Sequence, residues 1–295
     1  MKAACYTTNG DPSVLQYGNL PDPTVGDDEV LVRVEAISLE GGDIQSRRNK
    51  PPEHTPHVVG YAAAGVIEKV GPEVNGLVVG QRVACFNWQD SHAELFAVPA
   101  DFVFPVPDGL DIQTAAVGLI AYGIAHDALF EFGGLKAGET VLIQGATGGV
   151  GLAAVQLASQ AGATVLTTAS SAERNDRLRD YGSMHGIDYK QDDIAARARG
   201  LTDDSGVDLV IDLAGGKSVQ SVLHSLRYRG RMVSVGGASG EGASFEFGDI
   251  APESLAVYGM LFGKAPATHR VNTLVTTLFD DLAADRIKMP IDKKF

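Results

Sequence analysis

The chain has 295 residues, of which 44% are hydrophobic and 21% are charged, as expected for a globular protein of about two domains. Its net charge of −13 and its pI of about 4.9 disfavour binding to nucleic acid or to an anionic membrane surface, because both need clustered Lys and Arg. The two cysteines, Cys5 and Cys85, are too few for a disulfide framework or a cysteine-based zinc site. The N-terminal segment MKAACYTTNG lacks the apolar core of a signal peptide, so we expect a cytoplasmic protein.

Residues 1–115 consist of short runs of β-branched or alternating residues, separated by Pro and Gly. This pattern is typical of strands joined by turns, and it predicts a compact β-rich domain. The runs are EVLVRVEAI (29–37), AAGVIEKVG (63–71), QRVACF (81–86) and AELFAVPA (93–100).

The most apolar stretch of the chain, TAAVGLIAYGIAHDALF, follows this half. Two glycines, His126 and Asp127 interrupt it, so it predicts a buried helix rather than a membrane span.

From about residue 116 the pattern changes to apolar strands that alternate with helices. Strands that are apolar on both faces indicate a parallel sheet covered by helices on both sides, so this half is predicted to be a doubly wound α/β domain. The predicted strands lie within 139–146, 163–170, 207–216 and 231–240, and the predicted helices within 149–162, 171–182 and 218–230.

The turn between the first strand and the first helix of this half is rich in glycine. It reads Ala146-x-Gly148-x-x-Gly151, a dinucleotide-binding fingerprint whose first glycine is replaced. In this reading Gly148 and Gly149 let a pyrophosphate approach the backbone, and Gly151 lets the helix pack on the sheet. The alternative is a plain tight turn.

The end of the second strand of this half predicts which dinucleotide binds. Sites for NAD usually place an acidic residue there to bind the ribose 2′-hydroxyl. In this chain the strand ends TTASSAER, with no acidic residue until Glu173 in the next helix. Ser170, Ser171 and Arg174 are instead suited to a 2′-phosphate. The sequence therefore favours NADPH as the cofactor.

The order of motifs QGATGGVG, TTASSAER, GIDYK, VDLVIDLAGG and LRYRGRMVSVGG resembles the zinc-independent quinone oxidoreductases of the medium-chain dehydrogenase/reductase superfamily. The resemblance covers essentially the whole chain. It implies an α/β protein with a GroES-like substrate domain over residues 1–115, joined by 264–295, and a Rossmann domain over 116–263. It also implies NADPH in the cleft between the domains, homodimers formed by pairing of Rossmann sheet edges, and a C-terminal segment shorter than is usual in the family.

The related zinc alcohol dehydrogenases supply metal ligands from a Cys and from a Gly-His-Glu motif. This chain has Glu40 at the Cys position and Tyr61 and Ala62 at the His and Glu positions. Since no thiolate or imidazole stands there, we expect no catalytic metal.

The resemblance also implies site residues. Quinone oxidoreductases usually have Asn where Glu40 stands, and a carboxyl group there donates a proton only if burial keeps it protonated. Tyr61 and Glu40 are the catalytic candidates, and Asp43, Arg47 and Trp88 are candidates for the substrate pocket. The cofactor candidates are Ala146, Thr147, Gly148, Gly149 and Val150 near the pyrophosphate, Ser170, Ser171, Arg174 and Tyr189 near the adenosine and its 2′-phosphate, and Ala214, Val235, Gly236 and Gly237 near the ribose and nicotinamide.

The predicted reaction is hydride transfer from NADPH to a quinone or a similar conjugated carbonyl, because such acceptors need little help from a general acid. One alternative is reduction of the carbon–carbon double bond of an enone or enoyl thioester. Another is a non-catalytic NADPH-binding sensor or structural protein.

Overall fold

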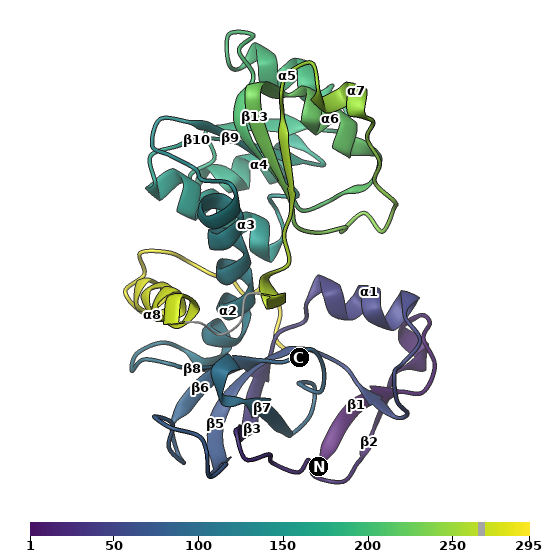
Figure 1. Cartoon of the computed structure of the whole chain (residues 1–295), viewed down its shortest axis with the longest axis vertical. Coiled ribbons are helices and arrows are strands. Elements are labelled where there is room, and N and C mark those ends of the chain that lie inside the picture. Colours follow the sequence, from purple (N-terminus) through teal and green to yellow (C-terminus); the bar gives the residue numbers. More distant parts are fainter. Residues whose placement is uncertain (265–268) are drawn as a thin grey trace. The chain divides into compact units, whose positions relative to one another are not determined.

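In a computed structural model, which describes residues 1–264 and 269–295, the chain divides into two compact units (Figure 1). Unit 1 comprises Met1–Ile120 and Gly263–Phe295, and unit 2 comprises Ala121–Phe262. The predicted segment 264–295 includes residues 265–268, which lie outside the described residues.

Unit 1 is built on two antiparallel sheets. A five-stranded sheet has the order β7-β3-β5-β6-β8, and a three-stranded sheet has the order β2-β1-β4. The four strand-like runs of the sequence coincide with strands of the larger sheet, so the predicted β-rich domain is confirmed. The strands are β1 (Lys2–Tyr6), β2 (Gln16–Asn19), β3 (Glu29–Ile37), β4 (His57–Val58), β5 (Ala62–Val70), β6 (Arg82–Phe86), β7 (Leu95–Pro99) and β8 (Val103–Pro105).

Alternation of side chains along the strands gives unit 1 its core. Val30 and Val32 point to the same face of β3 and pack with Ile67, Phe96 and Val98 from neighbouring strands. The helices of this unit are α1 (Gly41–Asn49) and α8 (His269–Ala283), with 3-10 turns at η1 (Pro12–Val14), η2 (Ala100–Phe102) and η5 (Phe262–Lys264), the last of which lies at the boundary with unit 2.

Unit 2 contains one parallel six-stranded sheet with the order β11-β10-β9-β12-β13-β14. In chain order this is 3-2-1-4-5-6, the arrangement of a dinucleotide-binding domain, and it confirms the predicted doubly wound fold. The strands are β9 (Thr140–Gln144), β10 (Thr164–Ala169), β11 (His185–Asp188), β12 (Val207–Asp212), β13 (Leu226–Ser234) and β14 (Ala256–Gly259). The helices are α3 (Gly149–Gln160), α4 (Ala172–Arg179), α5 (Ile194–Gly200), α6 (Val219–His224) and α7 (Phe247–Ile250), with a 3-10 turn η4 (Gly216–Ser218).

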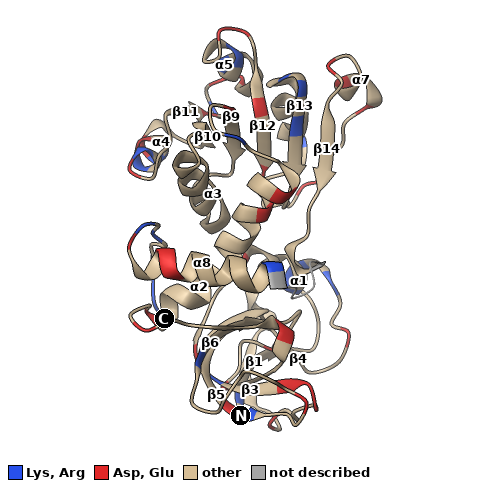
Figure 2. Ribbon diagram, turned by 60° about the vertical axis from the view of Figure 1, so that its left-hand side comes forward, with Lys and Arg blue, Asp and Glu red and all other residues tan. Residues whose placement is uncertain are grey.

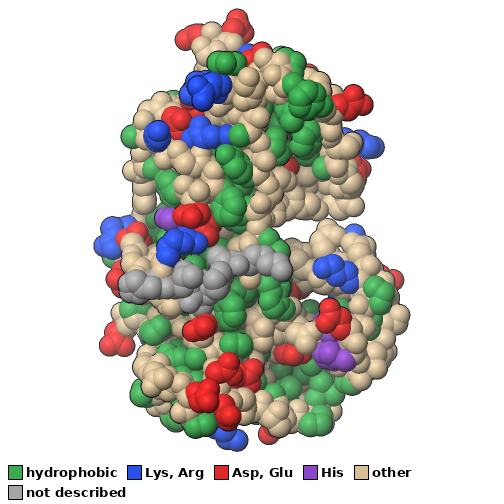
Figure 3. Space-filling view, in the orientation of Figure 1, with side chains coloured by type: hydrophobic (Ala, Val, Ile, Leu, Met, Phe, Trp, Pro, Cys, Tyr) green, Lys and Arg blue, Asp and Glu red, His purple; other side chains and the backbone are tan. Residues whose placement is uncertain are grey.

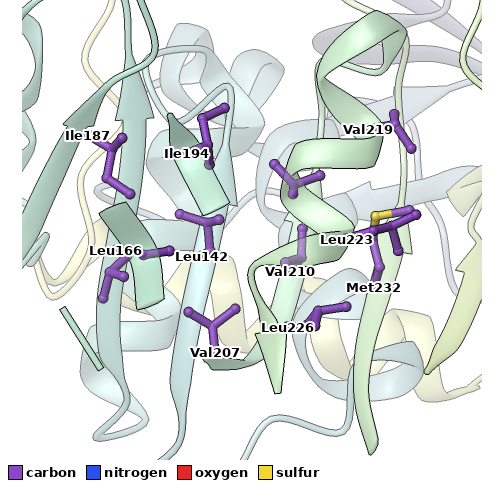
Figure 4. Packing of buried hydrophobic residues seen from close by; sticks show 12 residues of the cluster. Leu142, Leu166, Ile187, Ile194, Val207, Val210, Val219, Leu223, Leu226 and Met232 are labelled. Atoms are coloured by element: carbon purple, nitrogen blue, oxygen red, sulfur yellow. The ribbon is translucent and has the colours of Figure 1, made fainter. Parts of the chain in front are cut away.

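The strands of unit 2 are apolar because helices cover the sheet. Figure 4 shows Leu142, Leu166 and Val210 from three adjacent strands packed with Ile194 and Leu223 from helices α5 and α6. All five side chains are at most 6% exposed, so this cluster is the core that fixes the sheet.

The most apolar stretch of the sequence forms α2 (Ile112–His126) followed by a π-helical turn, η3 (Asp127–Phe132). Among the described residues this is the one helical stretch long and apolar enough to cross a membrane, with a mean hydropathy of 1.3. Since 67% of its apolar 18-residue window is buried inside the protein, it packs as a core helix does.

Candidate active site

All thirteen cofactor candidates follow strands of the unit 2 sheet at one edge, because its strands are parallel and their carboxyl ends lie together. The chain order reverses between β9 and β12, which is the switch point where doubly wound sheets bind ligands. The predicted residues lie after β9 (146–150), after β10 (170–174), after β11 (Tyr189), after β12 (Ala214) and after β13 (235–237).

The first turn of α3 is open to a ligand. Gly148 is the N-cap residue, with φ −83° and ψ 170°, and no side chain caps the helix. Thr147, Gly148 and Gly149 are exposed, whereas Ala146 is fully buried beneath them. A helix N-terminus without a side-chain cap offers backbone N–H groups and the positive end of the helix dipole, so this turn fits a pyrophosphate.

The third glycine of the fingerprint has a packing role. A β-carbon at Gly151 would lie 2.6 Å from the Cα of Ala146, so any side chain would push α3 off the loop. Gly145, at the start of that loop, has a φ of +79°, which also favours glycine. The glycines therefore serve three purposes: exposure at 148–149, a positive φ at 145 and close packing at 151.

The start of α4 (Ala172–Arg179) offers one unengaged cation. Ser171 caps this helix by accepting a hydrogen bond from the N–H of Arg174 at 3.3 Å. Figure 2 shows acidic and basic residues side by side on α4; Arg177 pairs with Glu173 at 2.7 Å. Arg174 is exposed and makes no ion pair with any described residue, so its guanidinium is available to an anion. The partly buried Ser170 precedes this helix, and Tyr189 is half exposed after β11.

A buried carboxylate shapes the loops after β12 and β13. The Oδ1 atom of Asp212 accepts hydrogen bonds from the N–H groups of Ala214 (3.0 Å) and Gly215 (2.9 Å) and from Gln144 Nε2 (3.1 Å). The N–H of Val235 donates to the Asp212 carbonyl oxygen at 2.9 Å, so both loops are fixed from one residue. Burial raises the pKa of Asp212, and these hydrogen bonds oppose that rise. Asp212 was not among the predicted site residues, although a charged residue at the end of the buried strand VDLVID was an available signal.

In unit 1 the two catalytic candidates lie beside each other at the start of α1 (Gly41–Asn49). Glu40 is the N-cap residue of this helix, and its Oε1 accepts a hydrogen bond from Ser38 Oγ at 2.6 Å. Its backbone N–H donates to Asp43 Oδ2 at 3.0 Å. The Tyr61 ring packs on Gly42, where a β-carbon would lie 2.9 Å from the Tyr61 hydroxyl oxygen.

Burial controls the charge of these groups. It raises the pKa of Glu40, although the hydrogen bond from Ser38 opposes this. It also raises the pKa of Asp43 to about 7, with a further increase from the nearby Glu40 carboxyl. Burial raises the pKa of Tyr61, and the nearby Glu40 and Asp43 carboxyl groups raise it further. The Tyr61 hydroxyl group therefore keeps its proton. The cluster therefore retains its protons to a higher pH than the same groups would in water.

His92 belongs to the same cluster, although it was not among the predicted site residues. Its side chain is buried, with Nε2 3.3 Å from the Ser38 carbonyl oxygen and 3.7 Å from Asp43 Oδ2. No local sequence pattern indicates this contact, because it joins segments that are distant in the sequence.

The other two pocket candidates make contacts within unit 1. Arg47 is buried, and its Nη1 donates a short hydrogen bond to the Gly10 carbonyl oxygen, which ties α1 to the loop before η1. Trp88 is 57% exposed, lies edge-on to Phe86 and contacts Gly263.

The residues present do not fit a catalytic zinc ion. Within residues 1–264 and 269–295, no three His, Cys, Asp or Glu side chains are grouped closely enough to hold a metal. Cys85 is fully buried in β6 (Arg82–Phe86), and burial raises the pKa of its thiol, which disfavours the thiolate that a metal needs.

Two family models match more than half of the chain between them. One describes an alcohol dehydrogenase GroES-like domain and matches residues 26–108; the other describes a zinc-binding dehydrogenase and matches residues 149–280.

Similar proteins extend the match to nearly the full length. A quinone oxidoreductase from Pseudomonas aeruginosa is 31% identical over 98% of this chain and 90% of its own length. A 2-haloacrylate reductase from Burkholderia is 34% identical over 90% of this chain and 80% of its own length. The crystal structure of Escherichia coli quinone oxidoreductase complexed with NADPH superimposes with a TM-score of 0.93 at 26% identity, covering 99% of this chain and 90% of that one. The chain therefore belongs to the zinc-independent quinone oxidoreductase branch of the medium-chain dehydrogenase/reductase superfamily.

Proposed function

We propose that this enzyme is an NADPH-dependent, zinc-independent oxidoreductase that reduces a quinone or a similar conjugated carbonyl. The observation that carries the proposal is the uncapped, exposed turn Thr147–Gly149 at the switch point of the unit 2 sheet, with the unengaged Arg174 after the neighbouring strand. The first feature suits a pyrophosphate and the second a 2′-phosphate. Relatives named as quinone oxidoreductases, one of them solved with NADPH, support the same assignment.

Each part of the nucleotide has a set of residues that would hold it. The N–H groups at the start of α3 (Gly149–Gln160) would bind the pyrophosphate. The adenosine and its 2′-phosphate would be held by Ser170, Ser171, Arg174 and Tyr189. The loops that Asp212 fixes, at Ala214 and 235–237, hold the ribose and nicotinamide. When bound, NADPH supplies a hydride to the acceptor.

The acceptor also needs a proton, and the α1 cluster of unit 1 offers one. Burial keeps Glu40 protonated to a higher pH than an exposed glutamate, and its carboxyl group is held by Ser38. We assign Glu40 as the proton donor and Tyr61 as a neutral hydrogen-bond donor to the acceptor oxygen. Asp43, Arg47 and Trp88 complete the proposed substrate side.

A second candidate reaction is reduction of a conjugated carbon–carbon double bond. The same Glu40 carboxyl favours it, because the carbon next to the activating group must gain a proton once the hydride has been delivered. The 34% identical 2-haloacrylate reductase supports this candidate.

The test is oxidation of NADPH by the purified, chelator-treated enzyme with benzoquinone, a simple enone or no acceptor, and with NADH in parallel. Benzoquinone-dependent turnover that prefers NADPH supports the main proposal. Turnover with the enone alone supports the second candidate. Tight NADPH binding without turnover of either acceptor would contradict both and favour a sensor or structural role.

We also propose that the enzyme is a homodimer formed through β14 (Ala256–Gly259). This strand lies at the end of the sheet and pairs with β13 alone in the described sheet order. Exposed apolar side chains lie on this strand and on β13, α7 and the segment after β14, and Figure 3 shows hydrophobic groups on the visible face of unit 2. They include Tyr228 (60% exposed), Phe247 (79%), Tyr258 (42%) and Leu261 (56%). An unpaired edge with apolar neighbours favours pairing with a second chain.

A further inference from the structure

His92 touches both residues that hold Glu40. Ser38 donates to the Glu40 carboxyl at 2.6 Å, and Asp43 accepts from the Glu40 backbone N–H at 3.0 Å. His92 Nε2 lies 3.3 Å from the carbonyl oxygen of Ser38 and 3.7 Å from Oδ2 of Asp43. One imidazole nitrogen therefore spans the two supports of the proposed proton donor.

The surroundings of His92 hold its ring in place. Its backbone N–H donates to the Val59 carbonyl oxygen, and its carbonyl oxygen accepts from the N–H of Ala4, both at 2.9 Å. The ring packs on Gly60, which has a φ of +92° and where a β-carbon would overlap the imidazole. The imidazole is therefore anchored to a different part of unit 1 from the helix that carries Glu40.

The hydrogen-bond partner of Nε2 shows which tautomer of His92 is present. A carbonyl oxygen only accepts hydrogen bonds, so Nε2 carries the hydrogen and donates it to Ser38. Burial lowers the pKa of His92, so the ring is neutral near pH 7, and the neutral ring still provides this donor. The other ionisable groups of the cluster are Glu40, Asp43 and Arg47 at or on α1, Tyr6 on β1 and Tyr61 just before β5.

We propose that His92 is a positioning residue for Glu40: its Nε2–H holds Ser38 and faces Asp43, and so keeps the Glu40 carboxyl in a single orientation. The inference rests on the proposed function, in which Glu40 is the proton donor. In each turnover the acceptor gains a hydride and a proton, the O–H bond of Glu40 breaks, and the carboxylate takes a new proton from water.

The proposal predicts a change in the pH profile. His92 Nε2 reaches Glu40 through Ser38, whose hydroxyl group donates to the Glu40 carboxyl at 2.6 Å. This hydrogen bond opposes the rise in the pKa of Glu40 that burial causes, so a displaced Ser38 leaves the carboxyl protonated to a higher pH. The alkaline limb of the kcat profile should then move to higher pH in variants that lack the His92 donor.

Three substitutions of His92 test this. Gln can place its amide nitrogen near the position of Nε2, whereas Asn is too short to reach Ser38 and Phe has no donor. We expect H92N and H92F to lower kcat by about tenfold or more, with the shifted alkaline limb, and H92Q to stay near the wild type. The dissociation constant of NADPH should not change, because all the proposed cofactor-binding residues lie in unit 2 and His92 is not among them. The matched control is His224→Asn on the exposed surface of unit 2.

The measurements are kcat and KM between pH 5 and pH 10 with the acceptor that the wild type reduces, and thermal unfolding of every variant. If H92F does not fold, the comparison of H92N with H92Q decides, because both are polar and smaller than Phe. A wild-type kcat and alkaline limb in H92N would overturn the inference.

A parallel Glu40→Gln variant tests the role of Glu40 as proton donor separately from the role of His92. If E40Q lowers kcat while H92N has no effect, Glu40 remains the proton donor and the role of His92 is wrong. If E40Q leaves kcat and its pH profile unchanged, Glu40 is not the donor and both assignments fail.

Discussion

Gly151 packs so closely on Ala146 that a β-carbon on the glycine would lie 2.6 Å from the alanine Cα. Gly149 differs, because its nearest neighbour would be the Cβ of Ala121 at an ordinary 3.8 Å. We therefore expect Gly151→Ala to destabilise the protein by about 1–3 kcal/mol. We expect Gly149→Ala to fold normally and to bind NADPH at least about tenfold more weakly, because it adds a methyl group to the exposed turn that is proposed to hold the pyrophosphate. Urea unfolding and fluorescence titration with NADPH measure the two effects, and wild-type NADPH affinity in G149A would contradict the site.

The fold was predictable because its signals are local. Alternation along β3 and the apolar runs of β9 and β10 reflect which faces are buried, and each is visible within one strand. The glycine turn could be predicted for the same reason. The contacts that support Glu40 could not be predicted, since His92 reaches Ser38 and Asp43 only after distant segments have folded together. The buried contact of Arg47 with Gly10 is equally non-local, so no local pattern indicated it, and the pocket role predicted for Arg47 came from the family resemblance.

Arg174 and Arg177 lie on the same helix but differ in their partners, which makes them a matched pair. Arg177 pairs with Glu173 at 2.7 Å, whereas Arg174 has no ion-pair partner among the residues that the structure describes. We expect Arg174→Ala to weaken NADPH binding by about 10- to 100-fold and to leave NADH binding unchanged, because only NADPH carries the 2′-phosphate. Arg177→Ala should change neither. Titrations at two salt concentrations measure this, and equal losses for both nucleotides would exclude Arg174 from the 2′-phosphate site.

Asp43 should make the stability of the protein depend on pH. Burial raises its pKa from 3.8 to about 7, so the folded state binds this proton more tightly than the unfolded chain does. The free energy of unfolding should therefore fall as the pH rises between these values, by up to about 4 kcal/mol from this group. Asp43→Asn keeps an oxygen to accept the Glu40 N–H and removes the titration.

Urea unfolding of the wild type and D43N at several pH values isolates this contribution as the difference between the two proteins. We expect equal stability near pH 4 and a more stable variant at pH 8. A difference that stays constant across this range would show that Asp43 titrates normally.

The edge strand β14 supplies the last prediction. A proposed dimer through this strand places Tyr258 and Leu261, 42% and 56% exposed, at or near the interface. An aspartate at either position would bring like charges from two copies together and remove apolar contact area, so Tyr258→Asp and Leu261→Asp should shift the protein toward a monomer. Light scattering after size exclusion distinguishes one chain of 30.9 kDa from two.

Leu15→Asp, at a 40% exposed position in unit 1, is the control and should remain dimeric. A wild type that is monomeric at micromolar concentration would contradict the interface, whereas monomers from both unit 2 variants alone would locate it at this edge.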